Sequence, residues 1–197
     1  MKKISTYQLT LTAIFIGILI FQTFVPFLGY IPIPPLNLTI IHITVIIGAL
    51  IIDRPYHIIV GIAWGLLSAS RAYIAPTSPF DILIFQNFII AVVPRALIPI
   101  AARLVFDALR EKNDFKLAAS AGAIVGTIVN TAGVLGLIAL IKGEQYATLK
   151  SVDVSQIYKL LGAVVLTNGV PEVIAAAIIV PTVVTIYLKT SKFRTHH

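Results

Sequence analysis

Six apolar segments, most of them long enough to cross a lipid bilayer, constrain this chain more than any other feature. A bilayer's hydrocarbon core is spanned by about 20 apolar residues in a helix. The segments cover residues 4–25, 38–53, 56–73, 80–110, 117–141 and 168–188. Only 12% of the 197 residues are charged, about half the share usual in soluble domains. The sequence therefore predicts an all-α integral membrane protein with one membrane domain over residues 1–197, and it excludes soluble enzymes and disordered proteins.

The distribution of Lys and Arg predicts how these segments are oriented, because cytoplasmic loops carry an excess of both residues. With six spans and an inner N-terminus, the cytoplasmic ends and loops hold ten of them: Lys2, Lys3, Arg54, Arg103, Arg110, Lys112, Lys116, Lys189, Lys192 and Arg194. The outer loops hold four: Arg71, Lys142, Lys150 and Lys159. This asymmetry predicts six transmembrane helices with both termini cytoplasmic. The same asymmetry accounts for the excess of basic over acidic residues, so no nucleic-acid partner is expected.

The first outer connection, residues 26–38, is rich in proline, at positions 26, 32, 34 and 35. Proline fixes φ and lacks an N–H donor, so this stretch is expected to follow an extended, polyproline-II-like course rather than a helix. A long apolar loop is costly in water unless it packs back on the helices. From these residues alone, a lid over an outward-facing pocket and a plain structural loop remain open.

Arg95 is the most informative polar residue inside a predicted span. It lies near the middle of residues 80–110, between Pro94 and Pro99, which are expected to bend the helix rather than end it. A charge at the centre of a transmembrane helix costs about 2.5–3.5 kcal/mol. The guanidinium could clamp a ligand carboxylate. It could instead pair with Glu172 or extend partly to the cytoplasmic interface.

Two amides complete the candidate polar set within the spans. Asn130 lies in the fifth span and Asn168 opens the sixth, and each offers donors and an acceptor suited to the amides and hydroxyls of a small ligand. For Asn168 a helix-capping role is an equally open alternative. The chain has no cysteine and no other residues at metal-ligand spacing, so neither a metal site nor a cofactor is expected.

Catalytic and nucleotide-binding motifs are missing from the sequence. It contains no G-x-x-x-x-G-K-[ST] loop, so the chain is not expected to bind ATP through a P-loop. It also has no G-x-S-x-G, H-E-x-x-H or paired-carboxylate arrangement. The protein is therefore expected to be no enzyme. His196 and His197 are left out of this reasoning because they could be native or belong to a purification tag.

Pairs of small residues four positions apart allow helices to approach closely. They occur at Ala13 and Gly17, Gly61 and Gly65, Gly122 and Gly126, and Ala132 and Gly136. With four such pairs in a short chain, most are expected to serve internal packing.

Several of these stretches together resemble the substrate-binding S-components of energy-coupling-factor (ECF) vitamin transporters. The resemblance runs through Phe27–Ile33, Leu38–Gly48, Trp64-Gly65-Leu66, Arg71-Ala72, residues 75–79 and Val93-Pro94-Arg95, with Ala13-x-x-x-Gly17 similar to the family's small-residue motif on its first helix. The motif's second small residue is glycine here rather than alanine, which should preserve close approach. The likeness covers essentially the whole chain.

This resemblance implies a multi-pass protein of a bacterial cell membrane that binds a vitamin with high affinity on the outer side, beneath the first loop as a lid. The implied substrate-binding residues are Tyr30, Trp64, Arg71, Arg95, Asn130 and Asn168. Ala13 and Gly17 are implied to dock on a transmembrane coupling subunit driven by two cytoplasmic ATPase subunits. The partners are thus a vitamin, these subunits and membrane lipid.

The sequence is most similar to the pantothenate-specific members of this family. Pantothenate has one carboxylate, one amide and two hydroxyls, which Arg95, Asn130 and Asn168 could meet. S-components for hydroxymethylpyrimidine or pyridoxine would rely more on stacking, and one for folate would need a larger aromatic surface; these remain alternatives. A self-contained secondary transporter is a further alternative, but such transporters usually contain an internal repeat, and residues 1–95 and 96–197 show none. An intramembrane enzyme or a purely structural subunit fits less well.

Overall fold

The computed structural model describes residues 6–25, 27–33, 36–111 and 114–194 and is almost entirely helical. The helices are α1 (Thr6–Phe24), α2 (Ile41–Ile51), α3 (His57–Ile74), α4 (Phe88–Arg110), α5 (Phe115–Leu149), α6 (Ile157–Val164) and α7 (Val170–Arg194). Shorter turns are η1 (Asp81–Phe85), η2 (Val154–Gln156) and η3 (Val165–Gly169), and two strands, β1 (Tyr30–Ile33) and β2 (Leu36–Thr39), precede α2.

Five of the helical segments in the described part of the chain are long and apolar enough to cross a bilayer: Thr6–Phe24, His57–Ile74, Phe88–Arg110, Phe115–Leu149 and Val154–Thr190. These segments are those of an integral membrane protein. The helix α2 has only 11 residues, which at 1.5 Å per residue reach roughly half of the hydrocarbon thickness. The count of six spans therefore stays a prediction.

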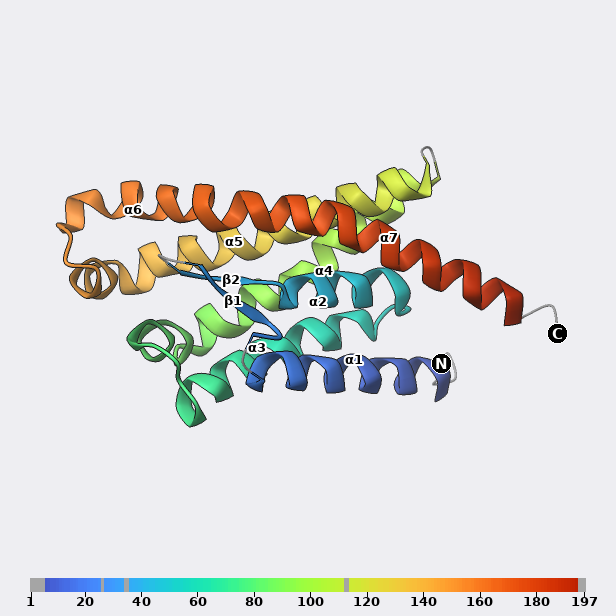
Figure 1. Ribbon diagram of the computed structural model, residues 1–197, viewed down its shortest axis with the longest axis horizontal. Helices are drawn as coiled ribbons and strands as arrows, with labels where there is room; N and C mark the ends of the chain where they lie inside the picture. The colour runs from blue at the N-terminus through green and yellow to red at the C-terminus, as the bar shows by residue number, and fades with distance from the viewer. Residues whose placement is uncertain (1–5, 26, 34–35, 112–113, 195–197) are drawn as a thin grey trace.

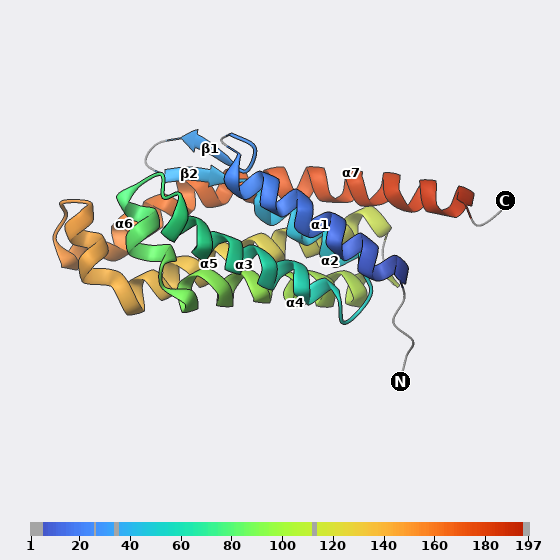
Figure 2. The ribbon, with the colours of Figure 1, turned by 90° about the horizontal axis from the view of Figure 1, so that it is seen from below.

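All the long helices run roughly along the long axis of the molecule (Figure 1). The start of α1 and the end of α7 lie at the same end of the bundle in both ribbon views, and we call it the terminal end (Figures 1 and 2). The turn between α5 and α6 and the segment between α3 and α4 lie at the opposite end, which we call the cavity end. The first and last long helices thus place their chain-terminal ends at the same end of the bundle.

The helix α4 begins later than the apolar pattern suggests. The side chain of Asn87 accepts hydrogen bonds from the backbone N–H groups of Ile89 and Ile90, which caps the helix at Phe88. Residues 81–85 form a separate π-helical turn. Pro94 and Pro99 lie within α4, which continues past them. Arg95 consequently lies about two turns into α4, not at the middle of a helix over residues 80–110.

The first connection contains paired strands rather than an isolated polyproline-II stretch. Strands β1 and β2 are antiparallel, with Tyr30 opposite Thr39 and Ile33 opposite Leu36. The backbone is extended, as expected from the prolines. In addition, backbone groups of the two strands form hydrogen bonds with each other. Pro26, Pro34 and Pro35 lie outside the described residues, so the expectation for those positions is not addressed.

Two of the small-residue pairs bring helices into contact inside the bundle. A Cβ on Gly61 would clash with the carbonyl oxygen of Arg95, and one on Gly65 would lie 2.7 Å from the Cα of Val92. A Cβ on Gly122 would lie 2.8 Å from the carbonyl oxygen of Ala102. These glycines let α3 and α5 approach the backbone of α4.

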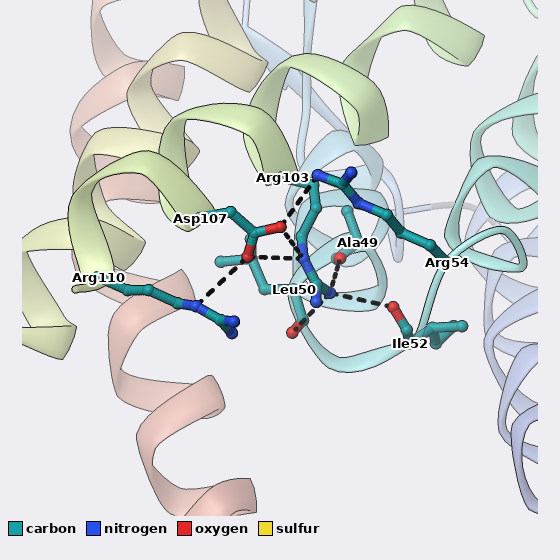
Figure 3. A network of polar contacts seen from close by, with 7 residues as sticks. All are labelled: Ala49, Leu50, Ile52, Arg54, Arg103, Asp107 and Arg110. Atoms are coloured by element: carbon teal, nitrogen blue, oxygen red, sulfur yellow. Dashed lines mark hydrogen bonds and ion pairs between the residues drawn. The ribbon is translucent and has the colours of Figure 1, made fainter.

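A network of arginines around Asp107 holds the terminal end together (Figure 3). Arg103 donates to both carboxylate oxygens of Asp107, at 3.1 and 3.0 Å. Its Nη1 also donates to the carbonyl oxygens of Ala49, Leu50 and Ile52, at 3.1, 3.5 and 3.2 Å. The end of α2 would otherwise leave such carbonyls unpaired. Arg103 therefore ties the short helix α2 to α4.

Replacing Arg103 with Gln is expected to lower the free energy of unfolding by roughly 3 kcal/mol, because it removes the charged donor of the carbonyl groups at the end of α2 and the least exposed of the three arginines around Asp107. Thermal unfolding in detergent measures the effect. Arg54→Gln is the matched control: Arg54 donates to the same carboxylate at 3.0 Å, but its side chain is 56% exposed, and such pairs contribute at most about 1 kcal/mol. Equal effects of the two substitutions would contradict the role given to Arg103.

Candidate ligand-binding site

A cavity of about 390 Å³ lies beneath the β-hairpin. Side chains from nearly every neighbouring element line it: Tyr30 and Thr39 from the hairpin, Trp64 from α3, Phe80, Asp81 and Phe85 before α4, Arg95 from α4, Asn130 and Thr131 from α5, Asn168 from η3 and Glu172 from α7. Its volume is in the range of small-molecule sites, and its mixture of apolar walls and a few polar groups is typical of them.

Arg95 is buried in this wall with most of its hydrogen-bonding capacity unused. Its residue exposure is 5%, its Nη1 donates to the carbonyl oxygen of Ile90 at 2.8 Å, and its Nε is buried without a partner. Pro94 has no N–H to offer the carbonyl four residues earlier, so the guanidinium takes the place of the missing helix hydrogen bond. The remaining donors are available to a ligand.

Two aromatic rings flank this guanidinium. Its central carbon lies 5.1 Å from the ring centroid of Trp64 and 4.7 Å from that of Phe85. Such cation–π contacts hold a cation in position without neutralising it. Trp64 is 1% exposed, and its Nε1 is buried without a hydrogen-bond partner. The indole N–H is therefore a second unused donor beside the cavity.

The structure does not pair Arg95 with Glu172. Among the described residues Arg95 forms no ion pair, and Glu172 instead accepts a hydrogen bond from the backbone N–H of Thr39 at 2.8 Å. Extension of Arg95 to the cytoplasmic interface is not seen either, because the side chain is buried against Trp64 and Phe85 and lines the cavity. A direct ion pair with Glu172 and an extension to the interface are thus both absent from the described residues, and the role of Arg95 as a ligand clamp stays a prediction.

The two predicted amides both reach the cavity. Asn130 is 5% exposed and its Oδ1 is buried without a partner, as is Oγ1 of the neighbouring Thr131. Asn168 is 6% exposed and accepts a hydrogen bond from Thr167 at 2.8 Å. It lies inside the π-helical turn η3, where the helix runs on from α6 into α7. The capping alternative for Asn168 is therefore wrong, and π-helical turns of this kind are frequent at functional sites.

Arg71 lies behind the cavity wall rather than in it. It is 7% exposed, its Nη2 donates to Oγ1 of Thr77 at 2.6 Å, and its Nη1 lies 3.5 Å from Asp81. Its guanidinium carbon lies 4.4 Å from the ring centroid of Tyr30. Tyr30 and Asp81 line the cavity and Arg71 does not. The residue thus joins the hairpin to the segment that precedes α4.

Five of the substrate-binding residues predicted from the sequence line the cavity: Tyr30, Trp64, Arg95, Asn130 and Asn168. The cavity is also lined by residues that the sequence did not predict for the site: the aromatic residues Phe80 and Phe85 and the polar residues Thr39, Asp81 and Thr131. Both phenylalanines fell within a predicted helix over residues 80–110, whereas in the structure they lie at and just before a separate turn at residues 81–85. Thr131 could have been found from its neighbour, because it directly follows Asn130, which was predicted to bind the ligand.

Ala13 and Gly17 lie on an exposed face of α1, away from the cavity. A Cβ on Gly17 would meet no atom within 4 Å. This glycine therefore serves no close contact within the chain, in contrast to Gly61 and Gly65. The structure leaves both positions open to another protein or to lipid.

Comparisons with known proteins agree with this architecture. A family model described as ECF transporter, substrate-specific component, matches residues 7–184. The chain is 34% identical over 197 residues to the pantothenic acid transporter PanT of Lactococcus lactis subsp. cremoris (strain MG1363), an alignment that covers 93% of this chain and 95% of that protein. It is 29% identical over 190 residues to the pantothenate transporter PanT of Leuconostoc mesenteroides subsp. mesenteroides, with 93% of each chain covered.

Proposed function

The chain belongs to the family of substrate-specific components of ECF transporters, and from this premise we propose that it is the pantothenate-binding subunit of an ATP-driven importer. It is a multi-pass protein of the bacterial cell membrane and a transport subunit rather than an enzyme. Two relatives that align over nearly their whole length carry the name of pantothenate transporters. High-affinity binding of the vitamin by this subunit alone is part of the proposal.

The observation that carries the proposal is the guanidinium of Arg95, which lines the cavity and forms no ion pair in the described part of the chain. A buried cation without an anionic partner is costly, and the carboxylate of pantothenate would supply that partner through charge-assisted hydrogen bonds. Asn130, Thr131 and Trp64 offer unused polar atoms for its amide and hydroxyls, and Asn168 lines the same cavity. Tyr30 would cover the ligand from the lid. Arg71 would act through Tyr30 without touching the ligand.

The proposal includes the topology and the partners. The six predicted spans, with α2 as the short one, place both termini in the cytoplasm and the cavity towards the outside. The exposed pair Ala13 and Gly17 on α1 would dock on a transmembrane coupling subunit. Two cytoplasmic ATPase subunits would hydrolyse ATP, since the sequence has no P-loop of its own.

Calorimetry on the purified subunit tests whether this chain binds the vitamin. Uptake into vesicles tests whether transport requires the coupling and ATPase subunits. We expect the isolated chain to bind pantothenate but to transport it only when the coupling and ATPase subunits are present. Transport by the isolated chain would identify a secondary carrier. Binding of hydroxymethylpyrimidine or pyridoxine in preference to pantothenate would identify an S-component for another vitamin.

Replacing Arg71 with Met is expected to speed ligand release about five- to thirtyfold, because a desolvated cation–π contact contributes on the order of 1–2 kcal/mol and here it holds Tyr30 in the lid. The association rate should change less, since most effects of such substitutions fall on dissociation. Release of radiolabelled pantothenate after dilution measures the rate. Arg71→Lys keeps a cation under the ring and should release more slowly than Arg71→Met. An unchanged rate in both variants would contradict the lid role.

A further inference from the structure

Glu172 connects the lid to the ligand cavity. It lies in the first turn of α7, is 5% exposed and lines the cavity. Its Oε1 accepts a hydrogen bond from the backbone N–H of Thr39 at 2.8 Å. Thr39 ends β2 and lies directly opposite Tyr30 of β1. Glu172 from α7 and Arg71 from α3 therefore hold the same cross-strand pair from two different helices.

The second carboxylate oxygen, Oε2, has no hydrogen-bond partner among the described residues. A carboxylate can accept several hydrogen bonds, so Glu172 has capacity for at least one more. Because Glu172 lines the cavity, a ligand in that cavity can supply the missing donor. Hydroxyl and amide N–H groups can do so, whereas a second anion cannot.

Two basic side chains, Arg95 and Lys150, and two acidic ones, Asp81 and Glu172, line the cavity. Asp81 is paired with Arg71, whereas Arg95 and Glu172 do not form an ion pair with each other. Arg95 forms no ion pair in the described part of the chain, and Glu172 is turned to the hairpin backbone. A ligand with one carboxylate and separate neutral donors satisfies both groups. A ligand with negative charge at both ends satisfies Arg95 but is repelled by Glu172.

We propose that Glu172 is a specificity-determining residue: one carboxylate oxygen holds the lid, and the other accepts a hydrogen bond from a hydroxyl or amide N–H of the ligand. The site then admits monoanions that carry such donors and rejects ligands in which a second anionic group replaces the donor. This inference rests on the proposed function. For pantothenate, it means that phosphorylation of the terminal hydroxyl, which replaces a donor by an anion, prevents binding.

Calorimetry on the purified full-length protein tests this with two probes, pantothenate and its phosphate ester at the terminal hydroxyl. The wild type should bind the ester about a hundredfold more weakly or worse, because close like charges cost several kcal/mol. In Glu172→Gln the amide oxygen can still accept from Thr39, but the negative charge is gone. The discrimination between the two probes should then fall by about tenfold or more.

Glu144→Gln is the matched control, since it removes the same charge from an exposed position on α5 and should leave the discrimination unchanged. Equal discrimination in the wild type and in Glu172→Gln would overturn the inference, and so would an equal fall in Glu144→Gln. The wild type alone provides a second test that needs no variant: tight binding of the ester would also overturn it. Failure of the wild type to bind pantothenate at all would instead remove the proposed function, and the inference with it.

Discussion

Replacing Arg95 with Gln is expected to weaken pantothenate binding about ten- to a hundredfold, because hydrogen bonds to charged groups contribute roughly 1.5–3 kcal/mol. The guanidinium is 5% exposed and its Nε has no partner, so under the proposed function it has donors free for the ligand carboxylate. Arg95→Lys should recover only part of the loss, since an ammonium group lacks the planar set of N–H donors with which a guanidinium binds both oxygens of a carboxylate. Calorimetry on the purified variants measures the affinities.

An analogue of pantothenate with its carboxylate reduced to an alcohol separates ligand contact from general damage. The wild type should bind this analogue weakly, and Arg95→Gln should bind it with about the same affinity as the wild type does. Arg54→Gln is the control for loss of a positive charge, because Arg54 lies in the network at the terminal end and should leave both affinities unchanged. Normal pantothenate binding by Arg95→Gln would remove the carboxylate clamp and favour a neutral vitamin precursor as the substrate.

Arg95 illustrates how much of the site the sequence predicts. A charged residue in an apolar segment indicates a function because its burial is costly, and the residue does line the cavity. Its depth and surroundings were not predictable, because they depend on the cap at Asn87 and on the turn at residues 81–85. Hydrophobic periodicity does not distinguish an apolar turn from the start of a helix.

The hairpin illustrates a second limit. Prolines predict extended backbone from their own geometry, but the register that places Tyr30 opposite Thr39 is set by tertiary contacts. Among these are the hydrogen bond from Thr39 to Glu172 and the stacking of Tyr30 on Arg71. These partners lie far apart in the sequence. Arg71 was accordingly expected to touch the ligand, whereas the structure places it behind Tyr30 and Asp81.

The small-residue pairs illustrate a third limit, because their spacing is the same whether they pack inside the chain or against a partner. Only the surroundings separate them. Gly61 and Gly65 lie against the backbone of α4, whereas the position of a Cβ on Gly17 is open. This difference allows a test in which the same substitution is made in both settings.

Replacing Gly17 with Leu is expected to abolish pantothenate uptake by the assembled transporter while leaving binding by the isolated chain within about twofold. A Cβ added at Gly17 meets no atom of this chain within 4 Å, but the leucine side chain would keep a partner helix from approaching α1 closely. Uptake into vesicles that contain all subunits and calorimetry on the isolated chain give the two readouts. Co-purification with the coupling subunit should be lost in parallel with uptake.

Gly65→Leu is the matched substitution at an internal site. A Cβ there would lie 2.7 Å from the Cα of Val92, so the change must push α3 away from α4. These helices carry Trp64 and Arg95, and overpacking at such a contact costs typically 1–3 kcal/mol or more. Gly65→Leu should therefore reduce binding and uptake together. If Gly17→Leu also lost both, α1 would be an internal packing element, and the docking surface would have to lie elsewhere on the chain.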